Sequence, residues 1–388
     1  MENINLFETI KRVAVGVFSE EGLQKRLATG KPLKIKLGAD PSRPDLHLGH
    51  SVPLRMLRKM QDAGHEIIFV IGDFTGMIGD PSGRSKTRPP LTFEETRLNG
   101  QSYFEQVSKI LDPAKTRIAY NSEWLGKMDF ADVLSLAGKY TLARIMERDD
   151  FSSRYKTKQP IGLHELFYPL MQGYDSIALH ADIEVGGTDQ TFNLLVGREL
   201  QKDYGQEPQE VITFPLLPGL DGIEKMSKSL DNYIGINEAA DVIFEKCMKV
   251  PDDILPEYFR LTTDISEAEY SRFLAQDIRL AHFAYAREIV RMYYHGADAV
   301  EQAEKRYLAI ASGQVPEDMR SLTISGEMNI VELLRKAGLA ATNSDARRLI
   351  EGGGIKLDGA TVNDAKLSVN SDAVLSRGKN KFVKIHMA

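Results

Sequence analysis

The chain has very little cysteine and tryptophan, with one of each among its 388 residues. The single cysteine, Cys247, excludes an internal disulfide and a zinc site built from several cysteines. Long hydrophobic runs are also missing, because the longest apolar stretch, residues 67–71, is far shorter than the ~20 residues of a membrane span. The first residues lack the basic and apolar segments of a secretory signal. We therefore expect a cytoplasmic protein that does not bind membranes.

Neither sign of charge is in large excess, since the chain contains 49 Lys and Arg and 55 Asp and Glu, which gives a net charge of −6. This balance excludes a surface covered in positive charge. The distribution is uneven, however. Residues 327–388 contain 10 Lys or Arg and 7 Asp or Glu, a net of +3, which leaves −9 for the preceding residues. The basic tail indicates an anionic partner near the C-terminus.

Hydrophobic periodicity predicts an α/β body at the start of the chain. Residues 33–38 read as a strand, 47–62 as a helix and 66–71 as a buried strand, and such a β-α-β unit builds a parallel sheet. Between them and the later strands, residues 94–180 read as mostly helical. Further elements of the body are predicted as strands at 183–185 and 211–214 and a helix at 190–204.

The rest of the chain reads as a helical region up to about residue 312, a linker, and a small α/β tail. In the tail we expect a helix over 329–337, and a second helix capped by Asn343 or Ser344. A short hairpin should turn at Asp358-Gly359.

Two histidines mark the start of the predicted helix over 47–62. His47 and His50 lie one turn apart on one face, where backbone N–H groups and the helix dipole favour a phosphate. Gly49 leaves room for a flat base. The pattern also fits two partly buried histidines that pack the helix start. Zinc is not expected, because no third ligand stands at a suitable spacing.

A second polar group lies in the glycine- and proline-rich loop over 215–235. Its segment Lys-Met-Ser-Lys-Ser contains Lys225, Lys228 and Ser229, which could hold a triphosphate as charge moves onto the departing pyrophosphate. Alone, such a segment is more typical of a solvated basic loop. Together with His-x-Gly-His after the first strand, however, it completes the two signature motifs of class I aminoacyl-tRNA synthetases, which this sequence resembles.

Within that class the chain resembles the tyrosyl-tRNA synthetases from end to end, in the bacterial branch whose loop reads Lys-Met-Ser-Lys-Ser. The match also rests on segments 36–42, 76–84, 168–175 and 185–190. The resemblance implies a Rossmann-like parallel-sheet catalytic domain with a helical insertion near 120–180, an α-helical anticodon-binding domain, and a small α+β S4-like domain. The corresponding boundaries are 1–237, 238–326 and 327–388.

The resemblance also implies roles for individual residues. Tyr168, Gln172 and Asp175, spaced to share one helix face, would bind tyrosine, with Asp175 accepting from the phenol. The other residues implied in tyrosine binding are Asp80 and Gln190. Those implied in ATP binding are Asp40, Ser42, Gly49, Asp189 and Ser229, and those implied in catalysis are His47, His50, Lys225 and Lys228.

One position departs from part of the family. Another branch has tyrosine where Lys36 stands, and uses that phenol to contact the substrate hydroxyl. Lys36 is therefore a candidate tyrosine-binding residue, and the second partner of the hydroxyl stays open.

The tail resembles the S4 RNA-binding module. Arg347 and Arg348 on its second helix, with Lys356 on the next strand, form a basic edge suited to RNA phosphates. A solvated helix face is the alternative interpretation.

The implied reaction starts with attack of the L-tyrosine carboxylate on the α-phosphorus of ATP. No enzyme base is needed, because the nucleophile is already anionic, so catalysis should rest on positioning and stabilisation of phosphate charge. A terminal ribose hydroxyl of tRNA(Tyr) then takes the tyrosyl group. Mg2+ should arrive with ATP, and the family is typically a homodimer formed through the helical insertion.

Three other functions stay open at this stage. A tryptophanyl-tRNA synthetase has the same signatures, although Asp175 and the S4-like tail favour tyrosine. A small nucleotidyltransferase would use the same phosphate chemistry but would not need the residues that follow the lysine loop. A non-catalytic RNA-binding paralogue is the third, and intact His47, His50 and Asp80 argue against it.

Overall fold

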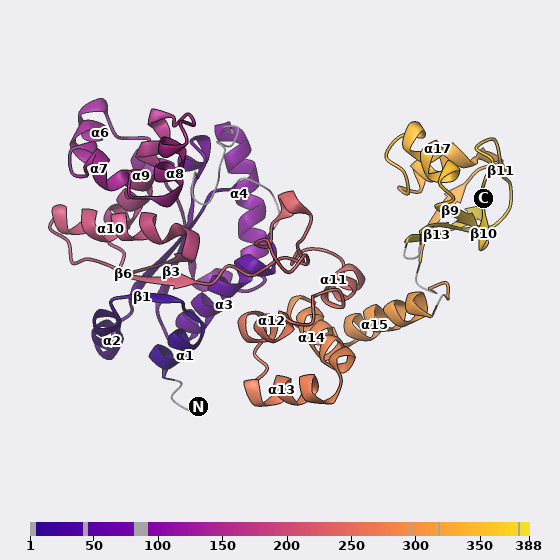
Figure 1. Ribbon diagram of the computed structural model, residues 1–388, viewed down its shortest axis with the longest axis horizontal. Coiled ribbons are helices and arrows are strands. Elements are labelled where there is room, and N and C mark those ends of the chain that lie inside the picture. The colour runs from indigo at the N-terminus through magenta and orange to yellow at the C-terminus, as the bar shows by residue number, and fades with distance from the viewer. Residues whose placement is uncertain are drawn as a thin grey trace. The chain divides into compact units, whose positions relative to one another are not determined.

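The computed structural model describes residues 5–41, 46–80, 92–294, 296–312, 314–316, 319–378 and 381–388. Its contacts divide the chain into two compact units, residues 1–239 with 246–289, and residues 240–245 with 290–388 (Figure 1). Within the described ranges, no helix is long and apolar enough to cross a membrane.

The first unit is built on a six-stranded sheet with the order β1-β6-β5-β2-β3-β4. Five strands are parallel, and β1 runs antiparallel to β6 at one edge. The strands are β1 (Gly16–Phe18), β2 (Lys34–Ala39), β3 (Glu66–Ile71), β4 (Thr116–Tyr120), β5 (Ile183–Gly187) and β6 (Glu210–Phe214). The expected Rossmann-like α/β sheet is confirmed, as are its four predicted strands.

Two edge strands were not predicted. β4 lies in a region whose sequence reads as mostly helical, and β1 has only three residues. Ala119 is the one fully buried side chain of β4, so this strand lacks the continuous apolar run by which buried strands are recognised.

Helices cover the sheet and fill the segment between β4 and β5 (Figure 1). Before that segment they are α1 (Leu6–Val13), α2 (Glu20–Ala28), α3 (Leu48–Asp62) and α4 (Phe93–Val107), with short 3-10 turns η1 (Thr75–Met77) and η2 (Pro113–Lys115). The segment itself contains α5 (Ser122–Leu125), α6 (Phe130–Ala137), α7 (Leu142–Ile145), α8 (Asp149–Lys156) and α9 (Leu163–Leu179). After β5 come η3 (Thr188–Gln190), α10 (Thr191–Asp203) and η4 (Lys228–Leu230).

The strand order places a crevice at the centre of the sheet. β2 and β5 are parallel neighbours, but the chain continues from β2 towards β3 on one side and from β5 towards β6 on the other. Parallel sheets bind ligands at the carboxyl ends of the strands where the order reverses in this way. The loops after β2 and β5 are therefore placed to form a binding site.

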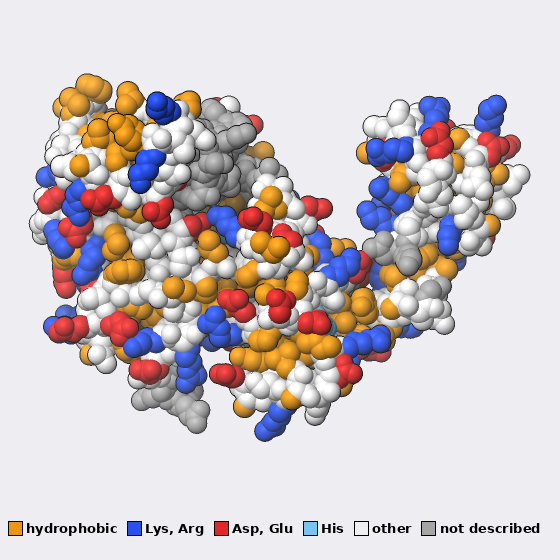
Figure 2. Space-filling model, viewed as in Figure 1, with side chains coloured by type: hydrophobic (Ala, Val, Ile, Leu, Met, Phe, Trp, Pro, Cys, Tyr) orange, Lys and Arg blue, Asp and Glu red, His pale blue; other side chains and the backbone are white. Residues whose placement is uncertain are grey.

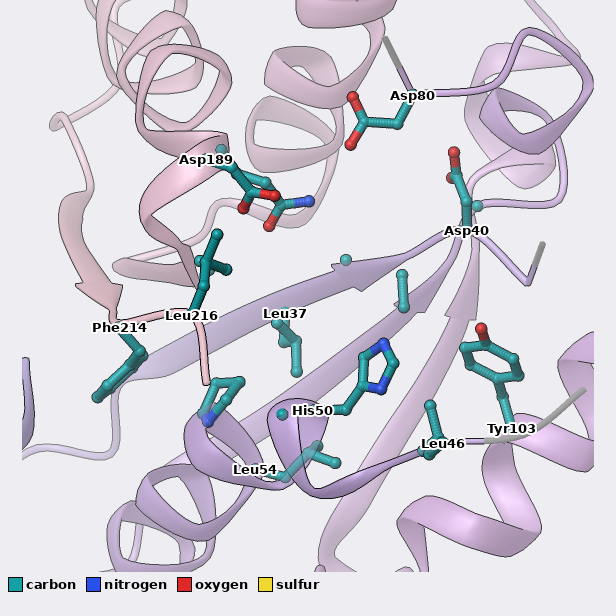
Figure 3. Close-up of a pocket in the computed structure, with 18 of the residues that line it drawn as sticks. Leu37, Asp40, Leu46, His50, Leu54, Asp80, Tyr103, Asp189, Phe214 and Leu216 are labelled. Atoms are coloured by element: carbon teal, nitrogen blue, oxygen red, sulfur yellow. The ribbon is translucent and has the colours of Figure 1, made fainter. Parts of the chain in front are cut away.

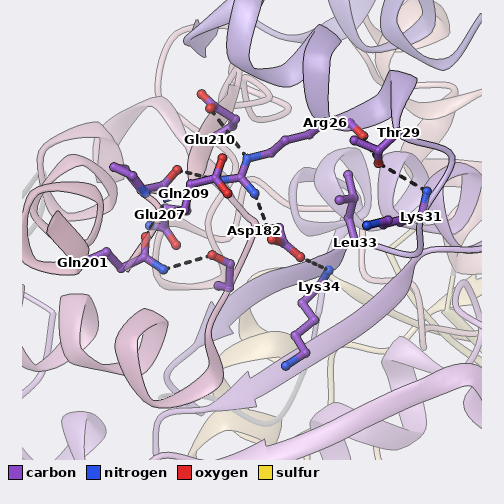
Figure 4. A network of polar contacts seen from close by, with 12 residues as sticks. Arg26, Thr29, Lys31, Leu33, Lys34, Asp182, Gln201, Glu207, Gln209 and Glu210 are labelled. Atoms are coloured by element: carbon purple, nitrogen blue, oxygen red, sulfur yellow. Dashed lines mark hydrogen bonds and ion pairs between the residues drawn. The ribbon is translucent and has the colours of Figure 1, made fainter. Parts of the chain in front are cut away.

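Arg26 ties α2 to the opposite ends of these strands (Figure 4). Its Nη1 donates to Asp182 Oδ1 at 2.9 Å, and Asp182 Oδ2 accepts from the backbone N–H of Lys34 at 2.8 Å. These bonds connect the largely buried Arg26 side chain to Asp182 and hold the amino ends of β2 and β5 together.

Helices follow the sheet, as expected for residues 238–312. They are α11 (Ala240–Cys247), α12 (Leu255–Thr262), α13 (Glu267–Gln276), α14 (Ile278–Tyr293) and α15 (Ala297–Ala311). The division between the two units passes through α11 and α14, so α12 and α13 belong to the unit that holds the sheet.

The second unit contains a five-stranded sheet with the order β10-β9-β12-β13-β7, beside a two-stranded pair of β11 and β8. Its elements are β7 (Arg320–Ile324), β8 (Met328–Asn329), α16 (Ile330–Lys336), α17 (Asn343–Glu351), β9 (Ile355–Leu357), β10 (Ala360–Thr361), β11 (Ser368–Val369), β12 (Ala373–Arg377) and β13 (Lys381–Met387). The hairpin at Asp358-Gly359 forms as expected, with both residues at positive φ.

Two details of this unit differ from the sequence analysis. β7 pairs in parallel with β13, so the sheet includes residues before Glu327 that were assigned to a linker. The cap of α17 is Thr342, whose Oγ1 accepts from the backbone N–H of Asp345 at 3.1 Å. The predicted caps, Asn343 and Ser344, instead lie in the first turn of the helix.

Candidate active site

A cavity of about 720 Å³ opens at the carboxyl ends of the central strands. Figure 3 shows Asp40 after a strand and His50 at a helix start, both facing this cavity. The predicted residues that line it are Asp40, His47, Gly49, His50, Asp80, Tyr168, Gln172, Asp175, Asp189, Gln190, Lys225, Lys228 and Ser229. Ser42, also predicted, lies outside the described residues.

The two histidines lie at the first turn of α3, with ring centroids 3.9 Å apart. The backbone N–H of His47 donates to Nδ1 of His50 at 3.2 Å. His50 is exposed at the cavity, and desolvation by the surrounding protein, with the charge of Lys225, lowers its pKa from 6.5 to about 4. Burial likewise lowers the pKa of His47. His50 is therefore neutral at pH 7 with its proton on Nε2, because Nδ1 accepts, so Nε2 is free to donate to a ligand.

The loop over 215–235 that contains Lys225 and Lys228, called the lysine loop below, contacts both the start of α3 and the opposite wall of the cavity. The N–H of Leu48 donates to Ile234 O at 2.9 Å. Lys225 Nζ forms an ion pair with Asp189 Oδ2 at 2.8 Å. Ser229 Oγ lies 2.8 Å from Ser227 Oγ. The loop thus places the Lys225 ammonium beside the carboxylate that follows β5, and Ser229 in the cavity wall.

A chain of hydrogen bonds crosses the part of the cavity that is lined by Asp40, Tyr168 and Asp175. The hydroxyl of Tyr168 donates to Asp40 Oδ2 at 2.8 Å, and Thr75 Oγ1 donates to Asp40 Oδ1 at 2.8 Å. Asn121 Nδ2 donates to Thr75 Oγ1 at 2.9 Å. The sequence analysis missed Thr75 and Asn121. Asn121 was missed because it follows strand β4, which was not predicted.

Asp175 lies at the buried end of this chain, 3% exposed. Its Oδ1 accepts from Trp124 Nε1 at 2.8 Å, and its Oδ2 accepts from Asn121 Nδ2 at 3.5 Å. Burial raises the pKa of Asp175 from 3.8 to about 7, while the charge of Lys36 and these two hydrogen bonds oppose the rise. Trp124 was also missed, although its being the only tryptophan could have drawn attention to it.

Comparison with known proteins identifies the family. A sequence model described as tRNA synthetases class I (W and Y) matches residues 28–310, and one described as S4 domain matches residues 328–375. The chain belongs to the class I tRNA synthetases of this group. The expected resemblance is thereby confirmed over most of the chain.

Individual relatives agree with this assignment. The curated tyrosine–tRNA ligase of Deinococcus radiodurans is 49% identical over 392 residues, which cover 97% of this chain and 95% of that protein. The corresponding ligase of Geobacter sulfurreducens is 50% identical over 395 residues, covering 98% of each.

Solved structures share the fold of this synthetase. A truncated mitochondrial tyrosyl-tRNA synthetase from Aspergillus nidulans matches with a TM-score of 0.67 at 23% identity, covering 79% of this chain and 94% of that chain. The tyrosyl-tRNA synthetase from Archaeoglobus fulgidus, complexed with L-tyrosine, matches with a TM-score of 0.63 at 24% identity, covering 77% and 98%.

Lys36 does not have the role suggested for it by the sequence analysis of this synthetase. Its side chain is fully buried and does not line the cavity. Nζ donates to Gln172 O at 3.0 Å and to Ser176 Oγ at 2.8 Å, and it pairs with Glu184 Oε1 at 2.9 Å. An ammonium has three protons to donate, so these acceptors leave none for a substrate hydroxyl.

The glycines after β5 leave space that side chains would fill. A Cβ on Gly186 would lie 2.7 Å from Gln190 Oε1, and one on Gly187 would lie 2.7 Å from Asp189 Oδ1. Glycine at both positions therefore lets Asp189 and Gln190 take their places in the cavity wall.

The predicted RNA-binding residues are exposed on the second unit. Arg347 and Arg348 lie on α17 and Lys356 on β9. Arg348 Nη2 pairs with Asp345 Oδ1 at 2.8 Å, so its charge is partly compensated within its own helix.

Proposed function

We propose that this chain is a tyrosine–tRNA ligase, which joins L-tyrosine to ATP and then transfers the tyrosyl group to the 3′-terminal ribose of tRNA(Tyr). The curated relatives at about half identity over nearly the full chain are tyrosine–tRNA ligases. The observation that carries the choice of tyrosine is Asp175, a buried carboxylate at the closed end of the cavity. Such a group can accept a hydrogen bond from a phenol and lacks that partner when phenylalanine is bound.

The amino end of tyrosine would lie among Asp80, Tyr168 and Gln172. Gln172 Nε2 donates to Glu184 Oε1 at 3.3 Å, and Gln172 Oε1 accepts from Asn193 Nδ2 at 3.0 Å. A carbonyl oxygen has two lone pairs, so Oε1 retains one that can accept from the substrate ammonium. Gln190 would contact the carboxylate.

The nucleotide would lie between the helix start and the lysine loop. A neutral His50 donates from Nε2 to a phosphate or ribose oxygen, with His47 and Gly49 beside it. Asp189 would accept from the ribose hydroxyls, which releases Lys225 from its present ion pair. Lys225, Lys228 and Ser229 then stabilise the negative charge that moves onto pyrophosphate.

Two partners and one ion complete the proposal. Mg2+ would enter bound to the phosphates of ATP. Arg347, Arg348 and Lys356 would contact tRNA phosphates. A homodimer would use exposed apolar side chains of the helical insertion, which are Phe130, Leu134, Leu142, Tyr155 and Leu163. Figure 2 shows apolar side chains gathered on the surface of this part of the molecule.

Pyrophosphate exchange measured with each of the twenty amino acids tests the proposal directly. We expect ATP–pyrophosphate exchange with tyrosine and none above background with phenylalanine or tryptophan. Exchange with tryptophan would assign the chain to the other branch of its group. No exchange with any amino acid would indicate a non-catalytic paralogue.

A further inference from the structure

A closed polar cluster lies directly behind the amino-acid end of the cavity. Lys36 on β2 and Glu184 on β5 are both fully buried and form an ion pair of 2.9 Å. Ser176 on α9 joins them, since its Oγ accepts from Lys36 and donates to Glu184 Oε2 at 3.0 Å. Gln209 Nε2 donates to the same carboxylate oxygen at 2.5 Å. Every partner of the pair is thus inside the protein.

Stability alone does not explain two buried charges at this position. Removing both charges from water is costly, and apolar replacements of buried ion pairs are often neutral or stabilising. The pair is instead distinguished by what it contacts. Lys36 bonds the backbone carbonyl of Gln172 and Glu184 bonds its side-chain amide, so both parts of one substrate-facing residue are held by the pair.

The same pair sets the electrostatic surroundings of Asp175. The ionisable or hydrogen-bonding groups that face this carboxylate are Lys36 from β2, Glu184 from β5, Asn121 and Trp124 from the segment after β4, and Tyr168 from its own helix. Lys36 is the cation in this set. Its charge is the largest influence that opposes the raised pKa of Asp175, whereas Glu184 adds a smaller rise.

We infer that Lys36 and Glu184 act as a positioning pair for amino-acid recognition, in which Glu184 orients the Gln172 amide and Lys36 favours the negatively charged form of Asp175. A charged Asp175 accepts strongly from the phenol of tyrosine and is left without that partner by phenylalanine. The inference rests on the proposed function, because it requires tyrosine in this cavity.

The double variant Lys36→Met with Glu184→Gln, in the full chain, tests the inference without leaving one charge buried alone. Loss of Lys36 should raise the pKa of Asp175 above about 7, and a rise of one unit lowers its charged fraction at pH 7 about fivefold. At pH 7 we expect KM for tyrosine in pyrophosphate exchange to rise about fivefold, with kcat changed much less. KM should recover towards the wild-type value at pH 9. The preference for tyrosine over phenylalanine should fall at pH 7.

A matched control removes another buried ion pair from the same unit. Arg154 and Glu165 have side chains only 6% and 1% exposed, and Glu165 lies on α9 with Asp175. Neither residue lines the cavity. The variant Arg154→Met with Glu165→Gln should keep the wild-type KM within about twofold at every pH.

The outcomes separate the inference from the proposed function. An unchanged KM, or a rise of the same size at every pH or in the control, would overturn the positioning pair. If the wild-type chain shows no exchange with tyrosine, the proposed function fails instead. The influence of Lys36 on Asp175 can still be tested then, by titrating the emission of Trp124 with pH in the wild type and the double variant without substrate. The midpoint of this titration should lie at higher pH in the double variant. An unchanged midpoint would refute the influence of Lys36 on the charge of Asp175.

Discussion

The contact between Trp124 and Asp175 should make the ionisation of the proposed tyrosine-recognition residue directly observable. Trp124 is the only tryptophan in the chain, and its Nε1 donates to Asp175 Oδ1 at 2.8 Å. Because burial raises the pKa of Asp175 to about 7, the emission of Trp124 should titrate near neutral pH in the folded, ligand-free protein. The variant Asp175→Asn should abolish this titration.

The same group should make folding stability depend on pH. The pKa of Asp175 lies near 3.8 in the unfolded chain and at about 7 in the folded one, so the folded state binds more protons between these values. The free energy of unfolding therefore falls as pH rises from about 4 to about 7, and is constant above that range as far as this group is concerned. At ~1.4 kcal/mol per unit, the shift corresponds to an upper value of about 4 kcal/mol.

Asp175→Asn removes this contribution while it eliminates tyrosine recognition. The variant should gain stability relative to the wild type as pH rises from 5 to 8, by about 3 kcal/mol, because only the two or so units between pH 5 and the folded pKa contribute. Urea unfolding followed by Trp124 emission at pH 5 and pH 8 measures the difference. A wild-type emission that does not titrate between pH 5.5 and 8.5, or a stability difference that is equal at both pH values, would refute the assignment of a raised pKa to Asp175.

Four other predictions concern the remaining parts of the site and the fold. Lys228→Ala should slow adenylate formation by about 10²–10³-fold with little change in tyrosine affinity; pre-steady-state assays beside equilibrium binding measure both, and unchanged chemistry would remove Lys228 from the proposed role. A chain ending at Ser312 should keep tyrosine-dependent exchange but lose most tRNA charging, and full charging would show that the tail is not needed for RNA binding. Gly197→Ala should destabilise the protein by about 1–3 kcal/mol, since its Cβ would lie 2.9 Å from Gln209 Nε2; an unchanged urea midpoint would contradict the close packing described. The ring protons of His50, with a pKa of about 4, should not shift between pH 5.5 and 8 in NMR spectra of the ligand-free protein, whereas a midpoint near 6.5 would show that burial does not control its charge.

Local patterns in the sequence were sufficient to predict the central strands and the segments that line the cavity at their ends. The buried strand over residues 66–71 and the helix after His47 are marked by hydrophobic periodicity, which depends only on near neighbours in the chain. The motifs around His47 and Lys225 are likewise contiguous, and the structure brings both segments to one cavity. The family followed from these contiguous segments.

Tertiary structure decided what depends on residues that are far apart in the chain. β7 becomes a strand because it pairs with β13 at the other end of the tail, and nothing in its own residues specifies that partner. Asn121 and Trp124 reach Asp175 because β4 joins the sheet. Lys36 is the clearest case. The sequence by itself placed it on the strand that leads to the site, but only the packing of β5 and α9 around it determined that its ammonium turns into the core, since a buried charge must lie where acceptors can satisfy it.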